Sequence, residues 1–323
     1  MKKSVSLLSG AIAATLLTSV ASAVPIYSDN FDVNTSANYT VNQDPDATAT
    51  FAYDYSADGI PSAPGSPGGS TRGVKFTAND GDQTAAAAAI NISPTGQSFS
   101  GNYTLRFHSW LNINGPFPAG GAGSTELLTA GIGNSGTAVQ KSTAPANGPW
   151  FAGSNEGGAT GDYRAYQTTS LEADASAVYA APGAAGTRRE SSNTYYHSAI
   201  PGNQMAPATQ QALDPVQQTG STAPGSLGFA WHLHEISKNG NAVSWSINGL
   251  PIATFANPTL GGSNVFVGHW DAFASIADDA RFSFGIIDNL VVDQVIPEPA
   301  SMTMLGMSAL GLLAAARRRR TIA

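Results

Sequence analysis

A regular alternation of apolar and polar side chains over residues 103–113 limits the fold of this chain more than any other feature. Its odd-numbered positions are mostly apolar and include Tyr103, Leu105, Phe107, Leu111 and Ile113. Its even-numbered positions are Thr104, Arg106, His108, Trp110 and Asn112. Successive side chains of a β-strand point to opposite faces of the sheet, so the pattern predicts a long strand with one apolar face.

Further short segments have the same character and are separated by loops rich in glycine and proline. The alternation recurs at residues 227–235 and 243–247, after which Asn248-Gly249 indicates a tight hairpin turn. Other strands are expected at residues 39–42, 50–55, 73–78, 85–92, 126–132, 251–255, 264–268 and 282–295, the last interrupted at Asp288-Asn289. Only 11% of the residues are charged, which excludes long surface helices rich in glutamate and lysine. Residues 24–295 are therefore predicted to form one all-β domain, an antiparallel sandwich of two sheets with a long flexible insertion near residues 193–225.

The amino-terminal residues have the three parts of a signal peptide. Met1-Lys2-Lys3 is basic, residues 5–20 are mostly apolar, and Ala21-Ser22-Ala23 provides the small residues that signal peptidase accepts. We expect residues 1–23 to be removed and the domain to mature outside the cytoplasm. The chain contains no cysteine, which excludes disulfides, thiol catalysis and cysteine-based zinc sites.

The carboxyl-terminal residues combine an extended motif, an apolar span and a basic cluster. Pro297-Glu298-Pro299 precedes the uncharged residues 300–316, and these precede Arg317, Arg318, Arg319 and Arg320. Seventeen helical residues span about 25 Å, enough to cross a thin bilayer. The arginines are expected to stay in the cytoplasm, so the helix would anchor the domain outside the inner membrane. The prolines keep the preceding peptide extended, as a processing enzyme requires.

This arrangement resembles the PEP-CTERM sorting signal of Gram-negative bacteria over residues 296–320. It matches at the Pro-Glu-Pro motif, at the apolar span with Gly306 and Gly311, and at the arginine cluster. The resemblance implies that a membrane-embedded exosortase recognises the tail and removes it, which leaves the protein at the cell surface or in the extracellular matrix. Such proteins are often made by bacteria that secrete exopolysaccharide. A plain membrane anchor is the alternative.

The two ends of the expected domain resemble the terminal strands of concanavalin A-like lectin and glucanase domains, which are jelly rolls. The first strand reads Tyr27-Ser28-Asp29-Asn30-Phe31-Asp32, and the last contains Ile287-Asp288-Asn289-Leu290. The resemblance implies that these two strands lie side by side. An immunoglobulin-like sandwich is the competing architecture.

The polar face of residues 103–113 is the leading candidate for a binding site. Sugar recognition needs an aromatic plate for the C–H face of the ring and planar polar groups for its hydroxyls. This face offers both, through Arg106, His108, Trp110 and Asn112, and we expect His232 and His234 to join it from a neighbouring strand. The expected function is non-catalytic binding of exopolysaccharide. The alternative is that loops cover this face and bury Trp110.

Catalysis is the second functional class to consider. Glycoside hydrolysis needs two carboxyl groups about 5–9 Å apart, and the glucanases that this chain resembles carry them in a Glu-x-Asp-x-x-Glu or Glu-x-Asp-x-Glu run. Glu172-Ala173-Asp174 lacks the second glutamate. We therefore expect no enzymatic activity, with a glycoside hydrolase and a purely structural surface protein as the alternatives.

Metal ions and nucleic acids are weaker candidates as partners. Asp80, Asp82, Asp278 and Asp279 place carboxylates in turns, which suits calcium but defines no ligand set. His232 and His234 would hold another metal only together with His108 or His269. Residues 24–295 carry nine basic and twenty-one acidic residues, a net charge of −12, so they lack the basic face that nucleic acid requires. No cofactor other than calcium is expected.

Overall fold

The structure, a computed structural model, describes residues 23–81, 87–143, 145–156 and 160–295. Residues 1–22 of the predicted signal peptide, Asp82, and the predicted sorting motif with its membrane helix lie outside these ranges. Among the described helices, none has the length and apolar character needed to cross a membrane. Residues 24–294 fold as one unit.

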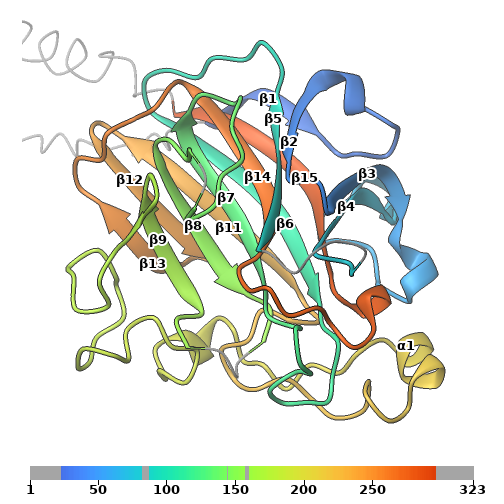
Figure 1. Ribbon diagram of the computed structural model, residues 1–323. Coiled ribbons are helices and arrows are strands. Elements are labelled where there is room, and N and C mark those ends of the chain that lie inside the picture. The colour runs from blue at the N-terminus through green and yellow to red at the C-terminus, as the bar shows by residue number, and fades with distance from the viewer. Residues whose placement is uncertain (1–22, 82–86, 144, 157–159, 296–323) are drawn as a thin grey trace, which may run out of the picture. The chain divides into compact units, whose positions relative to one another are not determined.

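Two sheets make up this unit (Figure 1). Sheet A has the order β13 (Leu250–Phe255), β12 (Ala242–Ile247), β11 (Trp231–Asn239), β6 (Tyr103–Asn112), β15 (Phe284–Val295), β4 (Arg72–Ala78) and β3 (Ala47–Asp54), with β1 (Ala23–Asp29) beside β15. Sheet B has the order β10 (Ser170–Leu171), β9 (Tyr163–Gln167), β8 (Pro149–Ser154), β7 (Glu126–Asn134), β14 (Asn264–Asp271), β5 (Ala88–Pro94) and β2 (Tyr39–Gln43). Neighbouring strands along both orders run antiparallel.

The predicted all-β antiparallel sandwich is therefore confirmed. The first and last strands, β1 and β15, pair as the resemblance to concanavalin A-like domains implied. The described residues form fifteen strands, whereas immunoglobulin-like sandwiches have about seven to nine. The immunoglobulin-like alternative is therefore excluded.

Local sequence signals explain several of these elements. The odd-numbered side chains of β6, such as Leu105 and Phe107, enter the core between the sheets as the alternation predicts. Asn248 and Gly249 both have positive φ, 50° and 78°, and join β12 to β13 in the predicted tight hairpin. The predicted interruption of the last strand is a β-bulge, because the register between β15 and β6 shifts between Asp288 and Val291.

Aromatic rings fill much of the core between the sheets. Phe151 of sheet B lies 5.3 Å from Trp245 of sheet A, measured between ring centroids. Phe107 stacks on His234 at 5.1 Å, and both belong to sheet A. Buried aromatic side chains remove large apolar areas from water and dominate the energetics of such cores. The inner face of sheet A is thus buried in the core, and only its outer face can reach solvent or a ligand.

The outer face of sheet B is also covered. Trp150 of β8, Tyr166 of β9 and Trp270 of β14 form a second buried cluster there. The amino-acid sequence does not predict β8 or β9. Both faces of these strands are buried, so their sequences do not alternate between apolar and polar residues.

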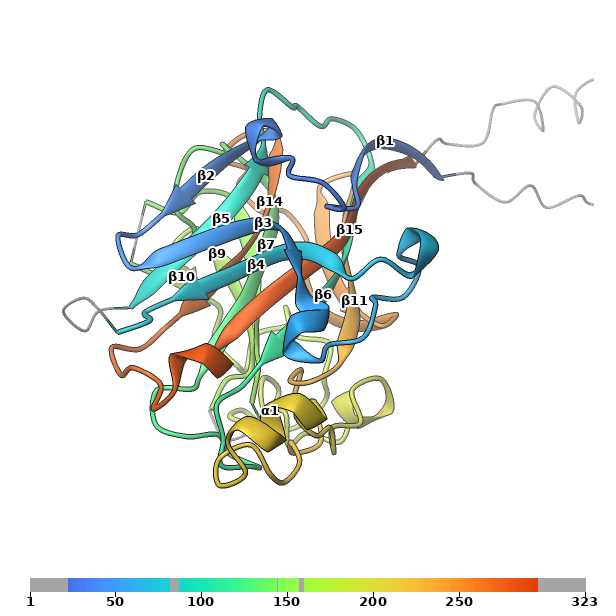
Figure 2. The same ribbon diagram turned by 90° about the vertical axis from the view of Figure 1, so that its right-hand side faces the viewer.

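Loops and short helices cover only one end of the outer face of sheet A (Figure 2). The covering segments carry η2 (Tyr55–Asp58), η3 (Pro67–Gly69), α1 (Ala208–Leu213) and η5 (Ala280–Phe282). By contrast, η4 (Tyr196–Ser198) packs through Tyr196 into the core between the sheets, and η1 (Ser36–Asn38) precedes β2. The segment predicted as an insertion near residues 193–225 contains η4 and α1. Beneath this cover lies a buried cluster that includes Tyr55, Ile60, Trp110, Phe229, Phe284 and Ile286.

Candidate functional site

The uncovered part of the outer face of sheet A carries a row of half-buried side chains across three strands. We call it the β6–β11 surface; it consists of Arg106 and His108 on β6, Trp231, Leu233 and Glu235 on β11, and Ser246 on β12. The strand register places these side chains on one face, because Glu235 pairs with Arg106, Leu233 with His108, and Glu235 with Ser246.

The prediction that His232 and His234 join this face is wrong. His234 pairs directly with Phe107, whose side chain is in the core, so both histidines point inward. The cause lies just before β11. Phe229 has a positive φ of 59°, which breaks the alternation and puts Phe229 and Trp231 on the outer face although Leu227 lies in the inner core.

The two inward histidines are held as neutral side chains. The Nδ1 atom of His234 accepts a hydrogen bond of 3.2 Å from Trp245 Nε1, and its Nε2 lies 2.9 Å from Ser109 Oγ. Burial holds the pKa of His234 well below its usual value and lowers that of His232 to about 4. His108 faces the other side of sheet A, and His269 lies on sheet B against Glu126. Nowhere in the described ranges do three or more His, Asp or Glu side chains gather so that they could hold a metal ion.

Two further predicted residues, Trp110 and Asn112, lie on the outer face but under its cover. Trp110 is 5% exposed and donates from Nε1 to Asn112 Oδ1 at 3.3 Å. Asn112 is fully buried and donates from Nδ2 to Gln210 Oε1 at 2.9 Å and to the main-chain oxygen of Phe282 at 2.7 Å. For this pair, the alternative of a loop-covered face is correct.

Arg106 and His108 remain reachable from solvent. The Arg106 side chain is 39% exposed and forms an ion pair with Asp293 of β15, whose side chain is only 3% exposed. Across the strand, Glu235 accepts a hydrogen bond of 3.4 Å from Ser246 Oγ. Burial lowers the pKa of His108, so this ring is neutral at pH 7. The surface thus presents a guanidinium, a carboxylate and a neutral imidazole in fixed positions.

Trp231 is the aromatic residue of this surface, although the alternation of residues 227–235 predicts it in the core. Its Nε1 donates to the main-chain oxygen of Pro61 at 2.7 Å, and its ring lies 5.2 Å from that of Tyr55. These contacts fix the indole, which stays half-buried rather than fully covered. The sequence does contain a signal for this outward position. Glu235 and Ser237 alternate in phase with Trp231, so the side of β11 that carries Trp231 is the polar one.

The carboxylates singled out for hydrolysis have structural partners. Glu172 and Asp174 follow β10 at the edge of sheet B, not sheet A. Asp174 accepts hydrogen bonds from the main-chain N–H groups of Gly186, Arg188 and Arg189, and so anchors a loop.

Asp288 is a second carboxylate in a structural role, although it lies opposite His108 in the register. It accepts hydrogen bonds from Tyr55 Oη at 2.9 Å and Ser66 Oγ at 2.8 Å, and burial raises its pKa to about 6. The Asp288 carboxyl group therefore ties the covering segment 55–66 to β15.

The calcium candidates do not form one described cluster. Asp279 is engaged by Arg281, with 2.5 Å between Arg281 Nη2 and Asp279 Oδ2. Asp80 and Asp278 are exposed, and Asp82 lies outside the described residues.

Comparison with known proteins identifies the carboxyl-terminal motif. Residues 295–320 match the family described as the PEP-CTERM protein-sorting motif, which contains the predicted Pro-Glu-Pro and arginine cluster. No curated protein matches the chain.

Three solved structures illustrate what the sandwich is similar to. A protein of unknown function with a galectin-like fold from Bacillus subtilis is 10% identical, with a TM-score of 0.40, over 86% of this chain and 100% of that one. The Emp47p carbohydrate recognition domain is 7% identical, with a TM-score of 0.41, over 85% and 97%. A laminarinase from Flavobacterium sp. UMI-01 is 14% identical, with a TM-score of 0.38, over 84% and 100%. The chain thus combines an antiparallel all-β sandwich with a match to the PEP-CTERM protein-sorting motif, and this motif implies export and processing by an exosortase.

Proposed function

We propose that this exported protein binds exopolysaccharide through the β6–β11 surface and does not cleave it. The observation that carries the proposal is the half-buried indole of Trp231, which shares one face of sheet A with Arg106, His108 and Glu235. The final location that we propose is the cell surface or the extracellular matrix.

The aromatic ring and the polar groups have complementary tasks in sugar binding. The fixed indole of Trp231 offers an apolar plate for the C–H face of a sugar ring, at a small entropic cost because its contacts to Pro61 and Tyr55 already orient it. Arg106 donates in a planar fork and Glu235 accepts, so neighbouring hydroxyls find both partners. Asp293 holds the guanidinium in place before a ligand arrives.

The accessible carboxylates favour binding over hydrolysis. Glycoside hydrolysis needs two carboxyl groups that both reach the scissile bond. Glu235 is half-exposed, but Asp293 is nearly buried and paired with Arg106. Asp288 is buried and hydrogen-bonded by Tyr55 and Ser66.

A binding assay with exopolysaccharide fragments tests the proposal. We expect saturable binding by residues 24–295, and an affinity at least tenfold lower for Trp231→Ala, which corresponds to about 1.4 kcal/mol. Phe273→Ala is the matched control, because Phe273 is 47% exposed outside the β6–β11 surface and its loss should leave the affinity unchanged. Equal affinities for wild type and Trp231→Ala would overturn the proposal.

The same fragments test the hydrolase alternative. If reducing sugar is released and Glu235→Gln stops the release, the protein is an enzyme and the non-catalytic part of the proposal is wrong. If the fragments neither bind nor are cleaved, the purely structural alternative is favoured.

A further inference from the structure

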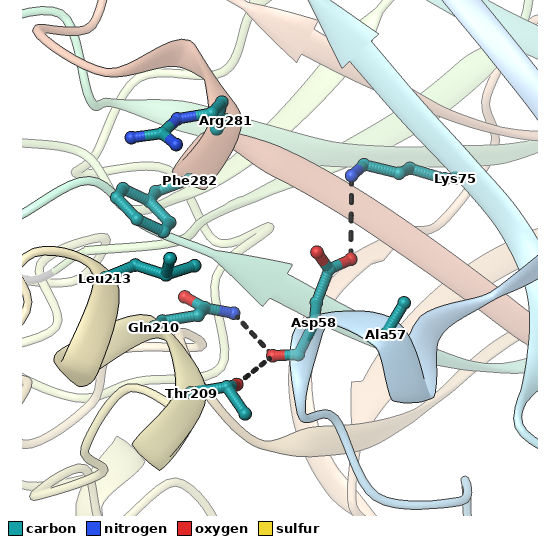
Figure 3. A pocket seen from close by; sticks show the side chains of 8 residues that line it. All are labelled: Ala57, Asp58, Lys75, Thr209, Gln210, Leu213, Arg281 and Phe282. Carbon is teal, nitrogen blue, oxygen red and sulfur yellow. Dashed lines mark hydrogen bonds and ion pairs between the residues drawn. The ribbon is translucent and has the colours of Figure 1, made fainter.

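A pocket of about 270 Å³ opens beside the covered end of sheet A (Figure 3). Four elements that are distant in sequence form it: η2, β4, α1 and η5. It lies on the β4 side of β15, whereas the β6–β11 surface lies on the other side of that strand. The pocket is smaller than the usual site of a drug-sized ligand, which suits an occupant the size of a single ring.

One wall of the pocket carries an ammonium group that is partly removed from water. Lys75 Nζ lies 3.6 Å from Asp58 Oδ2, 3.3 Å from Tyr53 Oη and 3.9 Å from the centroid of the Phe284 ring. Burial lowers the pKa of Lys75, while Asp58 opposes that shift. An ammonium has three donors, and the side-chain hydrogen bonds and ion pairs described above use two of them.

A second cation stands at the rim. The Arg281 side chain is 69% exposed, and Asp279 engages its Nε and Nη2 atoms. The charged residues that line the pocket are thus two cations, Lys75 and Arg281, and one carboxylate, Asp58. The surrounding residues 24–295 carry a net charge of −12. Lys75 and Arg281, each already paired with a carboxylate, are therefore the two lining groups that can attract an anionic group in a domain that otherwise repels it.

The opposite wall is apolar and held in place. Leu213 of α1, which is 67% exposed, and Phe282 face the pocket (Figure 3). Thr209 Oγ1 and Gln210 Nε2 donate to the main-chain oxygen of Asp58 at 3.2 and 3.1 Å and thereby fix α1 against η2. An occupant consequently meets Lys75 and Asp58 on one side, and Leu213 and Phe282 on the other, where Arg281 lies over the Phe282 ring (Figure 3).

We propose that this pocket binds a sugar unit that carries a carboxylate, such as a uronic acid residue. The carboxylate lies between Lys75 and Arg281, a ring hydroxyl donates to Asp58, and the C–H face packs against Leu213 and Phe282. The inference does not depend on the β6–β11 surface, because the two sets of residues have no member in common.

Glucuronate, glucose and acetate are the probes for this site, each titrated into the folded domain at low salt and followed by NMR. We expect glucuronate to bind in the millimolar range or tighter, and glucose and acetate to bind at least tenfold more weakly. Added salt should weaken the binding of glucuronate, because screening reduces the attraction between charges. If acetate bound as tightly as glucuronate, the pocket would be a simple anion site. If glucose bound as tightly as glucuronate, the cations would have no role in binding. Either result overturns the proposal, as does a lack of glucuronate binding.

Variants separate this pocket from the rest of the molecule. Leu213→Glu places a carboxylate at the pocket without changing the core, and we expect at least a tenfold loss of glucuronate affinity. Val216→Glu is the matched control, because Val216 is 78% exposed in the same segment but does not line the pocket. Lys75→Met should cause a similar loss, and Trp231→Ala should cause none. Unchanged affinity in Leu213→Glu and Lys75→Met would contradict the assignment even if the β6–β11 surface binds its glycan.

Discussion

Trp110 and Trp231 face each other across β6 and β11, with their ring centroids 5.8 Å apart, yet they have different roles. Trp110 is 5% exposed beneath the covering segments, whereas Trp231 is only half-buried. The alternation of β6 correctly predicts that Trp110 is on the outer face. It does not predict the cover, because Gln210, which binds Asn112 beside Trp110, is about a hundred residues away in sequence.

His232 and His234 show how one backbone angle reverses a prediction at the residue scale. In the sequence, both histidines are an odd number of residues from Leu227, which predicts that they lie on the opposite face of the strand. The sequence does not show that Phe229, which lies between Leu227 and the histidines, has a positive φ. Phe is an uncommon residue in that conformation, so no local signal announces it. Every residue of β11 beyond that point consequently lies on the face opposite to the predicted one.

The buried histidines make stability depend on pH. The pKa of His232 is about 4 in the fold, below its usual value of 6.5, so the unfolded chain takes up the proton first as the pH falls. The contribution of a neutral His232 to stability is therefore present above pH 6.5 and is lost as the pH falls toward 4. The variant His232→Gln lacks the titratable ring, so it does not lose this stability at low pH. From pH 8 to pH 5, we expect the free energy of unfolding of the variant to rise by about 2 kcal/mol relative to wild type.

Chemical denaturation at the two pH values measures this difference. Comparison with wild type at the same pH cancels the opposite effect of Asp162 and Asp271, whose pKa values burial raises to about 7. The difference at pH 8 reports only packing and hydrogen bonding, so it serves as the internal control. The same difference at pH 5 and pH 8 would mean that His232 is not held neutral.

At the scale of elements, α1 depends on the end of β6. Asn112 exchanges two hydrogen bonds with Gln210, at 2.9 Å each, and also binds the main-chain oxygen of Phe282. All of these groups are buried, since Gln210 is 2% exposed. The short helix, which forms part of the pocket, is thus held by a buried asparagine of sheet A as well as by its contacts with η2.

Asn112→Ala should therefore loosen α1 and destabilise the domain. At least two buried polar groups lose their partner, at about 1–3 kcal/mol each, so we expect the free energy of unfolding to fall by about 3 kcal/mol. Hydrogen exchange in residues 208–213 should also become faster. Asn102→Ala is the matched control, because Asn102 lies just before the other end of β6 and makes only exposed hydrogen bonds, to Asn239 and Gly240. Equal losses in the two variants would show that α1 does not depend on Asn112.

The two sheets differ in how well the sequence predicts them. Sheet A has one buried face and one partly exposed face, so β6 and β12 alternate visibly and the hairpin after β12 follows from Asn248-Gly249. In sheet B, β8 is buried on both faces, and so is β9 except at its half-buried last residue. Strand β8 then reads as Pro-Trp-Phe-Ala-Gly-Ser, which has neither alternation nor β-branched residues. Because other parts of the chain bury both faces of these strands, their sequences lack the alternation of apolar and polar residues. This explains why β8 and β9 are not predicted.

At the scale of the whole molecule, the sorting motif and the β6–β11 surface differ in how the sequence specifies them. The sorting motif is contiguous, so Pro297, Glu298, Pro299 and the arginine cluster identify it from sequence order alone. The β6–β11 surface instead brings together residues 106 and 235 through sheet register. No linear motif announces such a surface. Net charge adds one constraint at this scale, since a domain with a net charge of −12 accepts an acidic glycan only where cations such as Arg281 and Arg106 are exposed.

The tryptophan signals in an NMR titration with exopolysaccharide fragments test the central claim most directly. The five tryptophans report on different places: Trp231 on the β6–β11 surface, Trp110 beneath the cover, Trp245 in the core, and Trp150 and Trp270 on the outer face of sheet B. The account predicts that the ring signals of Trp231 shift most and saturate with the binding curve. A titration in which Trp150 or Trp270 shifts while Trp231 stays unchanged would contradict it.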